Sequence, residues 1–392
     1  MKKHIVIGQA GGPTSVMNAS LIGLIEKVYK DHKLTFSVGG YEGLAYANFI
    51  DDSIKNIEKI KQYKRVPGSC LTSGRFKIEE STIVSACQNL KKISADALVM
   101  IGGNGSMKAL QLIGCYAKTF NLDLQTIGIP KTVDNDLAGT DHAPGFGSAV
   151  RYVAQSVKDI GYDLASMQNF EQVRIIETMG RNAGWLTAGA GLYKQYGFEA
   201  PHTILLPETQ VDSRQVLDEI KKTIELYGYS IVVVSEGVNW EHNQYRQLVN
   251  GREVLGGVAR NIVKTIQNNL QVHARAEILG MNQRSSSIFV SEQDFYEAEN
   301  AGKYAGILIN EGRTEEMVTI ERISTAPYHV KMGGISLTTV ANGGEKVMPK
   351  EFIKNRDKYY EWLSPLVGPE NYLSPPSLFR KEEKYASSFH QS

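Results

Sequence analysis

The chain has 392 residues, which is more than one hydrophobic core usually organises, so we expect two lobes. Its 43 Lys and Arg residues nearly balance its 42 Asp and Glu residues, and the net charge of +1 lacks the single-sign field expected of a protein that binds nucleic acid or an anionic membrane. Hydrophobic residues make up 42% of the chain, an ordinary content for a globular protein, and no apolar run reaches 18 residues.

The cysteines and the first residues bear on the cellular compartment. Cys70, Cys87 and Cys115 have neither CxxC spacing nor an even count, so we expect reduced thiols. The start MKKHIVIGQAGG has a basic and then an apolar part, but the five apolar residues are too few for the core of a signal peptide. We therefore expect a soluble cytoplasmic protein with no nucleic-acid or membrane partner.

The first predicted unit is a strand, a glycine turn and a helix. Residues 4–8 are a buried strand by their apolar pattern, QAGGPTS follows at 9–15, and apolar residues recur at helical spacing over 16–29. Glycines let a backbone approach phosphate, and a helix N-terminus favours an anion. The turn lacks the lysine of a GxxxxGK[ST] loop, and glycine pairs also follow first strands in α/β proteins without such a ligand. By itself this turn does not establish a phosphate site.

Two further loops add polar groups. A second strand at 34–39 is followed by the loop SCLTSGRF at 69–76, in which Arg75 can clamp a phosphate bidentately or can be a solvated surface residue. A third strand at 95–101 ends in GGNGS at 102–106, where a helix begins. This second glycine turn again directs backbone N–H groups and a helix N-terminus to the region above the sheet.

A fourth strand, at 125–129, opens into the segment PKTVDND at 130–136. Ligands of an α/β sheet bind outside the carboxyl ends of its strands, so three strand ends are expected to meet at one crevice. There Asp134 can act as a general base, Lys131 can neutralise phosphoryl charge, and Thr132 offers a hydroxyl donor. The alternative is a strand-to-helix connection made of turn and capping residues.

The second half of the chain repeats this strand-and-helix plan. After a helix at 146–160, strands are expected at 173–177, 202–206, 230–234, 275–279 and 317–323, and helices through 185–186 and at 211–227, 252–268 and 293–310. The tail beyond Met348 is polar and rich in Tyr and Lys, and we expect a helix followed by a weakly ordered end. The predicted fold class is α/β, with two Rossmann-like lobes, mainly parallel sheets and a cleft between the lobes.

In their order along the chain, these motifs resemble those of the phosphofructokinase family. They are GGPTSVMNAS near the start, TSGRF at 72–76, GGNGS at 102–106, PKTVDND at 130–136, TMGR at 178–181, SEG at 235–237 and RAEILGMNQR at 275–284. The resemblance covers nearly the whole chain. It implies a Mg²⁺-dependent phosphotransferase of the 6-phosphofructokinase type, which moves the terminal phosphoryl group of its donor to a hydroxyl of a sugar phosphate.

The resemblance also implies three sets of site residues. The catalytic set would be Asp134 as the base, with Thr132, Arg181 and Lys131. The set at the donor phosphates would be Gly12, Arg75, Phe76, Gly103, Asn104, Gly105 and Ser106, with Asn104 on the side of the metal ion. The set at the sugar would be Thr132, Asp134, Asp136, Met179, Gly180, Arg181, Glu236, Arg275, Met281 and Arg284, of which Arg275 and Arg284 would bind its distal phosphate.

The choice of donor rests on two positions. In the pyrophosphate-dependent branch an aspartate stands at the place of Gly105, and its bulk and charge exclude the α-phosphate of a nucleotide. The same branch carries a lysine at the place of Lys131, where bacterial ATP enzymes usually carry glycine. We give Gly105 more weight, because a lysine near phosphate is compatible with either donor. ATP is therefore the expected donor and pyrophosphate the alternative. At the position where the family usually has an aspartate on the side of the metal ion, this chain has Asn104.

The acceptor site departs from the usual pattern of the family. Near Gln172 the ATP-dependent members have an arginine that reaches the 6-phosphate across a subunit interface, and Arg174 is a candidate substitute on the same strand face. Met281 replaces a hydrogen-bonding histidine. Each lost charge-assisted contact costs about 1.5–3 kcal/mol. We expect fructose 6-phosphate or a similar sugar phosphate, and the alternative is an acceptor without the distal phosphate.

The resemblance further implies how the molecule is organised. Residues 1–140 with about 256–300 would form a donor-binding lobe, 141–255 with about 301–347 a sugar-binding lobe, and 348–392 a C-terminal extension. Because sites of the family borrow residues across an interface, we expect a homodimer or homotetramer. The effector-site arginines of bacterial members correspond to Ile22 and Glu26, so we expect no control by phosphoenolpyruvate or ADP of that type. An alternative from a different functional class is a non-catalytic protein of the same fold that senses a ligand.

Overall fold

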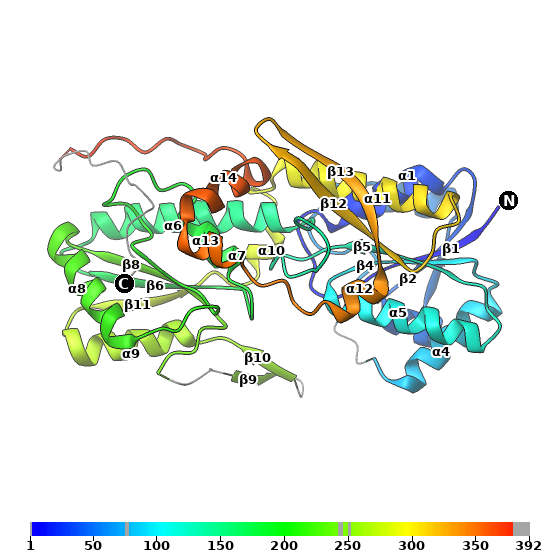
Figure 1. Ribbon diagram of the computed structural model, residues 1–392, viewed down its shortest axis with the longest axis horizontal. Helices are drawn as coiled ribbons and strands as arrows, with labels where there is room; N and C mark the ends of the chain where they lie inside the picture. Colours follow the sequence, from blue (N-terminus) through cyan, green and yellow to red (C-terminus); the bar gives the residue numbers. More distant parts are fainter. Residues whose placement is uncertain (1, 75–77, 242–245, 250–251, 379–392) are drawn as a thin grey trace. The chain divides into compact units, whose positions relative to one another are not determined.

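The chain is described by a computed structural model, in which residues 2–74, 78–241, 246–249 and 252–378 are placed. It divides into two compact units (Figure 1). The first comprises Met1–Ala149 and Arg284–Lys346, and the second comprises Val150–Gln283 and Val347–Ser392. Each contains a mainly parallel sheet flanked by helices, which confirms the predicted α/β class.

The described part of the first unit contains a seven-stranded sheet in the order β13-β12-β5-β4-β1-β2-β3. The inner strands run parallel, whereas β13 and β3 pair antiparallel at the two edges. The inner strands β1 and β4 are buried along their whole length, as expected when helices cover both faces of a parallel sheet. The strands are β1 (His4–Gln9), β2 (Lys33–Ser37), β3 (Phe49–Asp51), β4 (Ala97–Gly102), β5 (Gln125–Pro130), β12 (Glu316–Thr325) and β13 (Tyr328–Ser336).

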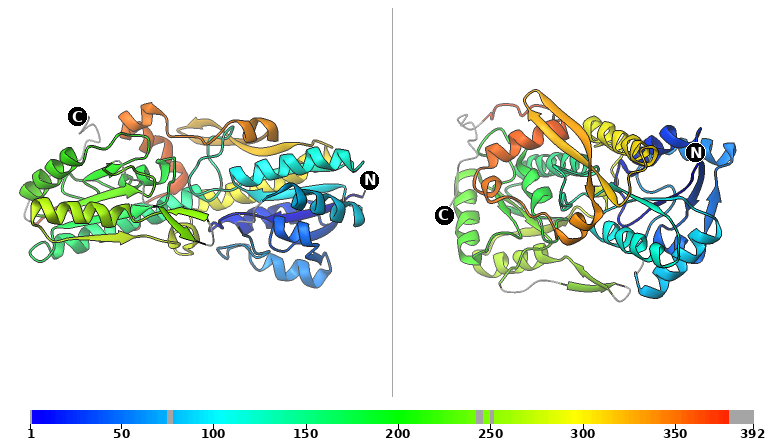
Figure 2. Two further views of the ribbon diagram at one scale, coloured as in Figure 1. Left: turned by 90° about the horizontal axis from the view of Figure 1, so that it is seen from below. Right: turned by 45° about the vertical axis from the view of Figure 1, so that its right-hand side comes forward.

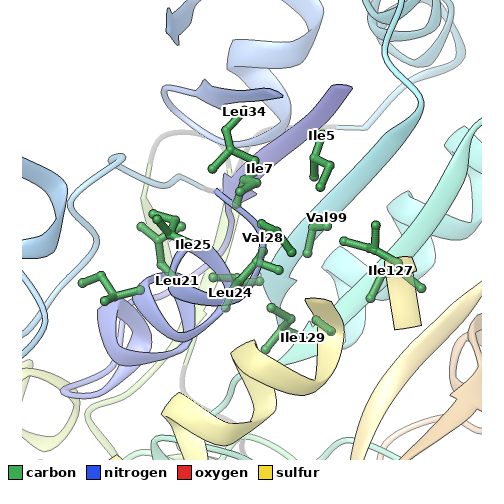
Figure 3. Packing of buried hydrophobic residues seen from close by; sticks show 14 of the residues in the cluster. Ile5, Ile7, Leu21, Leu24, Ile25, Val28, Leu34, Val99, Ile127 and Ile129 are labelled. Carbon is green, nitrogen blue, oxygen red and sulfur yellow. The ribbon is translucent and has the colours of Figure 1, made fainter. Parts of the chain in front are cut away.

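Helices lie on both faces of this sheet (Figures 1 and 2). On one face α1 (Met17–Val28) and α11 (Glu292–Asn310) pack against Ile5 and Ile7, and Figure 3 shows the apolar side of α1 turned toward these strand residues. On the other face α4 (Glu80–Lys92) and α5 (Asn104–Thr119) pack against Val6, because successive side chains of a strand point to opposite faces. The shorter helices are α2 (Tyr41–Tyr46), α3 (Ile54–Lys61) and α12 (Leu337–Asn342).

Small residues let α1 and α11 approach each other closely. A Cβ atom on Gly23 would overlap the carbonyl oxygen of Glu299, and one on Gly302 would overlap the carbonyl oxygen of Ser20. α1 directly follows the first glycine turn, so its close packing on α11 fixes the position of the helix N-terminus at that turn.

The described part of the second unit contains a four-stranded parallel sheet in the order β11-β6-β8-β7. Its strands are β6 (Val173–Thr178), β7 (Thr203–Leu205), β8 (Ser230–Ser235) and β11 (Ala274–Ile278). One face is covered by α8 (Ser213–Tyr227) and α9 (Val258–Leu270), and Figure 1 shows α6 (Phe146–Ser166) on the other. The remaining elements are α7 (Trp185–Ala188), the 3-10 helix η1 (Gly189–Gly191), β9 (Arg246–Val249), β10 (Arg252–Leu255), α10 (Asn282–Ser285), α13 (Lys350–Lys354) and α14 (Arg356–Val367).

The compact units differ from the predicted lobes at residues 141–149, 256–283 and 301–346, and the predicted extension 348–392 belongs to the second unit. Residues 256–283 belong to the second unit because β11 pairs with β6. Residues 301–346 belong to the first unit because β12 pairs with β5 and α11 packs on α1. The assignment of one lobe to the donor and one to the sugar stays a prediction.

One predicted helix was wrong in its first part. Residues 252–268 were expected to be helical, but Arg252–Leu255 forms β10 and α9 begins at Val258. Gly256 and Gly257 lie between them with φ of +144° and +94°, values outside the helical range that glycine adopts readily. Among the described helices, none is both long and apolar enough to cross a membrane.

Candidate active site

The two glycine turns of the first unit are neighbours, because β1 and β4 pair in parallel and both turns follow the carboxyl ends of these strands. Gly11 has a φ of +77°, and a Cβ atom built on it would lie 3.3 Å from Lys131 Nζ and 3.9 Å from Ser106 Oγ. Gly103 is the N-cap residue of α5. An amine, a hydroxyl and a helix N-terminus therefore surround a space from which a side chain is absent, which is the arrangement that binds phosphate groups.

Two cations reach the turn after β1. Lys131 is only 4% exposed, and its Nζ donates a hydrogen bond to the carbonyl oxygen of Gly12 at 2.6 Å. Arg284 Nη1 lies 2.8 Å from the point where a Cβ atom on Gly12 would stand. The resemblance had placed Arg284 at the distal phosphate of the sugar, and that role stays a prediction. In the first unit its guanidinium lies against the glycine turn.

The segment after β5 is tied together by the carboxylate of Asp136. Thr132 Oγ1 donates to Asp136 Oδ1 at 2.8 Å and accepts a hydrogen bond from Asp134 N at 3.0 Å. Asn104 Nδ2 donates to Asp136 Oδ2 at 2.9 Å. Both carboxylate oxygens of Asp136 are thus engaged within the first unit, and the hydroxyl hydrogen of Thr132 is used as well. The predicted contact of Asp136 with the sugar and the predicted role of Thr132 as a hydroxyl donor to the substrate stay predictions. In this arrangement both groups already have hydrogen-bond partners within the chain.

Buried groups that the sequence did not single out support these turns. The hydroxyl of Tyr41 donates to the carbonyl oxygen of Ser106 at 2.5 Å, and burial raises the pKa of this tyrosine. Asp294 accepts from Gly145 N at 2.8 Å and from Ser148 N at 3.0 Å, so it caps the start of α6. Burial raises the pKa of Asp294 to about 6, although these hydrogen bonds oppose the rise.

A histidine is buried in the loop that leads to α6. His142 is 1% exposed, and its two ring nitrogens lie 2.8 Å from Asp141 Oδ2 and 2.6 Å from Glu297 Oε2. Burial disfavours the charged imidazolium, but the carboxylates of Glu297 and Asp141 outweigh this effect and raise the pKa of His142 to about 9. Glu297 in turn accepts a hydrogen bond from Tyr328 on β13. This network joins the loop to α11 and to the edge of the sheet.

In the second unit, the ends of β6 and β8 meet. The hydroxyl of Ser235 donates to the carbonyl oxygen of Gly180, and Glu236 N donates to Thr178 O at 2.9 Å. Gly180 has a φ of +130°, which favours glycine, and a Cβ atom on Gly237 would overlap the carbonyl oxygen of Arg181. The predicted residues Met179, Gly180, Arg181 and Glu236 are therefore brought together in one turn region.

The segment after β11 joins the same region through a residue that the sequence analysis passed over. Met179 N donates to Gln283 Oε1 at 2.9 Å, and Gln283 is 2% exposed. Its place in the GMNQR motif, next to Arg284, was the available signal. Met281 lies in this segment too, and it is 58% exposed.

The charged residues at the amino ends of β6 and β11 form a separate cluster. Arg174 donates to Glu171 at 3.1 Å and to Glu277 at 2.8 Å, so it is not an uncommitted cation. Arg275 pairs in register with Arg174, and its Nε lies 3.4 Å from Glu171 Oε2. Three residues of strand, or about 10 Å, separate Arg275 from the end of β11 at Ile278. Within one chain the structure thus keeps Arg275 away from the Met179–Arg181 turn.

Asn104 is the predicted residue whose chemistry fits a metal ion. Its Oδ1 is buried and accepts no hydrogen bond from the described residues. A neutral carbonyl oxygen is a hard ligand suited to Mg²⁺, which usually takes one or two protein oxygens together with substrate phosphates. The described residues contain no group of three His, Cys, Asp or Glu placed to hold a metal.

Gly105 and the loop at 69–76 complete the predicted donor set. Apart from its chain neighbours and the backbone of its own helix, no described atom lies within 4 Å of a Cβ atom built on Gly105, which is exposed. Arg75 and Phe76 lie outside the described residues. Their predicted contacts with the donor therefore stay predictions.

Comparison with known proteins identifies relatives along the whole chain. The family model described as Phosphofructokinase matches residues 4–309. A sulfofructose kinase of Alkalicoccus urumqiensis is 41% identical, covering 93% of this chain and 95% of that protein. A pyrophosphate–fructose 6-phosphate 1-phosphotransferase of Xanthomonas campestris is 32% identical, covering 95% and 93%. The crystal structure of a pyrophosphate-dependent phosphofructokinase from Marinobacter aquaeolei has a TM-score of 0.84 at 30% identity, covering 96% of this chain and 93% of that one.

Proposed function

The chain belongs to the phosphofructokinase family, and from this premise we propose that it is a Mg²⁺-dependent kinase that transfers the terminal phosphoryl group of ATP to sulfofructose. Sulfofructose is taken here as a fructose that carries a sulfonate where fructose 6-phosphate carries its phosphate. The name of the Alkalicoccus relative suggests this acceptor. The ion pairs of Arg174 are the observation in this chain that supports it most directly.

The cluster of Arg174, Arg275, Glu171 and Glu277 favours an acceptor whose distal group carries a single negative charge. Arg174 is ion-paired with Glu171 and Glu277, and the exposed Met281 cannot donate a hydrogen bond. A phosphate ester carries about −1.5 to −2 charges at pH 7, whereas a sulfonate carries one. Each charge-assisted contact that is lost costs about 1.5–3 kcal/mol, and the dianion depends on more of them. A monoanion therefore suits these residues better than a sugar 6-phosphate.

The reaction assigned to the first unit is a direct phosphoryl transfer. Asp134 takes the proton of the acceptor hydroxyl as that oxygen attacks the terminal phosphorus of ATP, the bond from this phosphorus to the bridging oxygen breaks, and ADP leaves. Lys131 and the N-terminus of α5 neutralise charge on the donor phosphates, Gly12 and Gly103 let the backbone approach them, and Ser106 offers its hydroxyl. When bound with the donor, Mg²⁺ supplies positive charge to the phosphate oxygens. Asn104 is the residue that we assign to the ion.

The second unit is assigned to the acceptor. Met179, Gly180 and Glu236 would hold the sugar, and Arg181 would neutralise charge on the transferred group. Arg275 is exposed at the amino end of its strand and has, among the described residues, one ion pair, with Glu171, whereas the much less exposed Arg174 has two. We assign it to the distal anion in the site of a second copy of the chain, and this assignment implies a homodimer or homotetramer.

ATP is the proposed donor because the position of Gly105 leaves open space where an acidic side chain would exclude a nucleotide. The second candidate function is phosphorylation of fructose 6-phosphate by pyrophosphate. Lys131 and the printed names of the Xanthomonas and Marinobacter relatives favour this alternative.

A donor-by-acceptor activity matrix tests the proposal. ATP and pyrophosphate are each assayed with sulfofructose, fructose 6-phosphate, sedoheptulose 7-phosphate and unphosphorylated fructose. We expect the highest kcat/KM for ATP with sulfofructose. An Asp134→Asn variant serves as the control, since it should lose turnover by about 10²–10⁴-fold and still bind the donor. If kcat/KM is higher for fructose 6-phosphate than for sulfofructose with either donor, the acceptor is fructose 6-phosphate and the proposal is wrong.

A further inference from the structure

The side-chain amide of Asn104 has only one orientation that its surroundings allow. Its Nδ2 lies 2.9 Å from the carbonyl oxygen of Asp136 and 2.9 Å from Asp136 Oδ2. Both neighbours are acceptors, so both amide hydrogens are used and the nitrogen must face Asp136. A flipped amide would place Asn104 Oδ1 against two oxygens. The carbonyl oxygen of Asn104 is therefore turned away from Asp136.

This oxygen is left without a protein partner. Asn104 Oδ1 is buried and accepts no hydrogen bond from the residues that the structure describes. A buried acceptor in this state is unfavourable unless a cation or a donor group meets it. Asn104 is the first residue of α5, beside Gly103 and two residues before Ser106, so the oxygen belongs to the turn assigned to the donor phosphates.

The backbone and carboxylate of Asp136 are themselves held in place. Its Oδ1 accepts from Thr132 Oγ1 at 2.8 Å, and its carbonyl oxygen also accepts from Lys346 N at 2.8 Å. Thr132 Oγ1 accepts from Asp134 N at 3.0 Å. One carboxylate thus fixes the amide of Asn104 on α5 and, through Thr132, the backbone of the assigned base.

We propose that Asp136 is a positioning residue that aims Asn104 Oδ1 at the Mg²⁺ of the donor complex. The inference rests on the proposed function for the identity of that complex. An aspartate at position 104 would face Asp136 with like charge, and only a cation or a proton would relieve the repulsion. The amide–carboxylate pair needs neither. This chain therefore forms its metal-side geometry before the ion arrives and supplies a neutral ligand in place of an anionic one.

The test measures metal binding without any acceptor. Mn²⁺ replaces Mg²⁺, and its affinity is followed by electron paramagnetic resonance in the presence of the non-hydrolysable ATP analogue AMP-PNP. The measurement is repeated with imidodiphosphate, so that the result does not depend on which donor the enzyme uses. The variants are Asn104→Ala, Asp136→Asn and the exchange Asn104→Asp with Asp136→Asn. The matched control is Asn269→Ala, an exposed asparagine on α9.

The exchange is informative because it restores the hydrogen bond with its polarity reversed. In the double variant the amide at 136 would donate to a carboxylate at 104, and the net charge of the pair is unchanged. The hydrogen bond to the backbone carbonyl oxygen of residue 136 is not restored, because a carboxylate at 104 cannot donate it. We expect each single variant to weaken Mn²⁺ about 10–100-fold, the usual effect of losing a ligand or the residue that orients it. The exchange should bind Mn²⁺ more tightly than Asp136→Asn alone, because the side-chain hydrogen bond between positions 104 and 136 is restored.

Two results would overturn the inference. If Asn104→Ala leaves the Mn²⁺ affinity unchanged, Oδ1 is not a ligand. If the exchange binds as weakly as Asp136→Asn alone, Asp136 contacts the ion itself or acts only through the fold, which thermal unfolding of the variants would report. The proposed acceptor has a separate test, because a wild type that binds Mn²⁺ as expected but does not phosphorylate sulfofructose contradicts the proposed function alone.

Discussion

Replacing Gly105 with Asp should separate nucleotide from pyrophosphate use. Gly105 is the second residue of α5 and is exposed, and a Cβ atom built on it has no described atom within 4 Å other than its chain neighbours and the backbone of its own helix. The Cβ atom of the new side chain therefore has space, and a carboxylate in the first turn of a helix stabilises that helix by about 0.3–1 kcal/mol. At ~5 Å from an α-phosphate, one added charge costs about 3 kcal/mol at an effective dielectric constant of 20, and less where solvent screens it.

We therefore expect Gly105→Asp to lower kcat/KM for ATP by about 5–150-fold, which corresponds to about 1–3 kcal/mol. The apparent melting temperature should stay the same or rise. Gly105→Asn is the matched control, because it has almost the same volume without the charge. Steady-state kinetics with ATP and with pyrophosphate give the comparison. An unchanged kcat/KM for ATP, or an equal loss in the Asn variant, would refute the electrostatic argument for donor choice.

Three further predictions follow from contacts in the structure. The pKa of His142 in the folded protein is about 9, above the ordinary 6.5. Its protonation therefore adds up to about 3 kcal/mol to the free energy of unfolding, and this contribution is complete below pH 6.5 and is lost as the pH rises through 9. The difference in urea unfolding between wild type and His142→Gln, measured from pH 6 to pH 10, should shrink accordingly, and a constant difference would contradict the assignment. Gly302→Val should lower the free energy of unfolding by about 3 kcal/mol or more, because its Cβ would overlap the Ser20 carbonyl oxygen, whereas Gly105→Ala should have a small effect in the same assay. Glu277→Gln should release Arg174 in part and raise kcat/KM for fructose 6-phosphate relative to sulfofructose by up to about fivefold, since a half-exposed ion pair is worth about 1 kcal/mol. An unchanged ratio would show that Glu277 does not influence the choice of acceptor.

The strand ends were predictable because local patterns determine them. Short buried runs that stop at Gly or Pro marked β1, β4 and β5, and parallel pairing then brought their carboxyl ends to one edge of the sheet. The unit boundaries were not predictable in the same way. They depend on β12 returning to β5 and on β11 pairing with β6, and these are long-range pairings that no local pattern specifies.

The site was predictable in its composition and much less in its hydrogen bonds. The sequence pointed to Asp136 and Asn104 as separate ligands, one for the sugar and one for the metal. Their direct hydrogen bond depends on the geometry of two segments that lie 32 positions apart. Arg174 is a similar case, because a strand arginine looks like a free cation until Glu171 and Glu277 are seen beside it. Gln283 and Asp294 were missed since buried polar residues that bind backbone N–H groups have no periodic pattern.

The central claim concerns the charge of the group at the distal end of the acceptor. The direct measurement is the ratio of kcat/KM for sulfofructose to that for fructose 6-phosphate, with ATP as donor and both acceptors in one assay. We predict a ratio of at least about 10, because losing one charge-assisted contact at about 1.5–3 kcal/mol disfavours the dianion by about 10–150-fold. A ratio near one, or in favour of fructose 6-phosphate, would contradict the account.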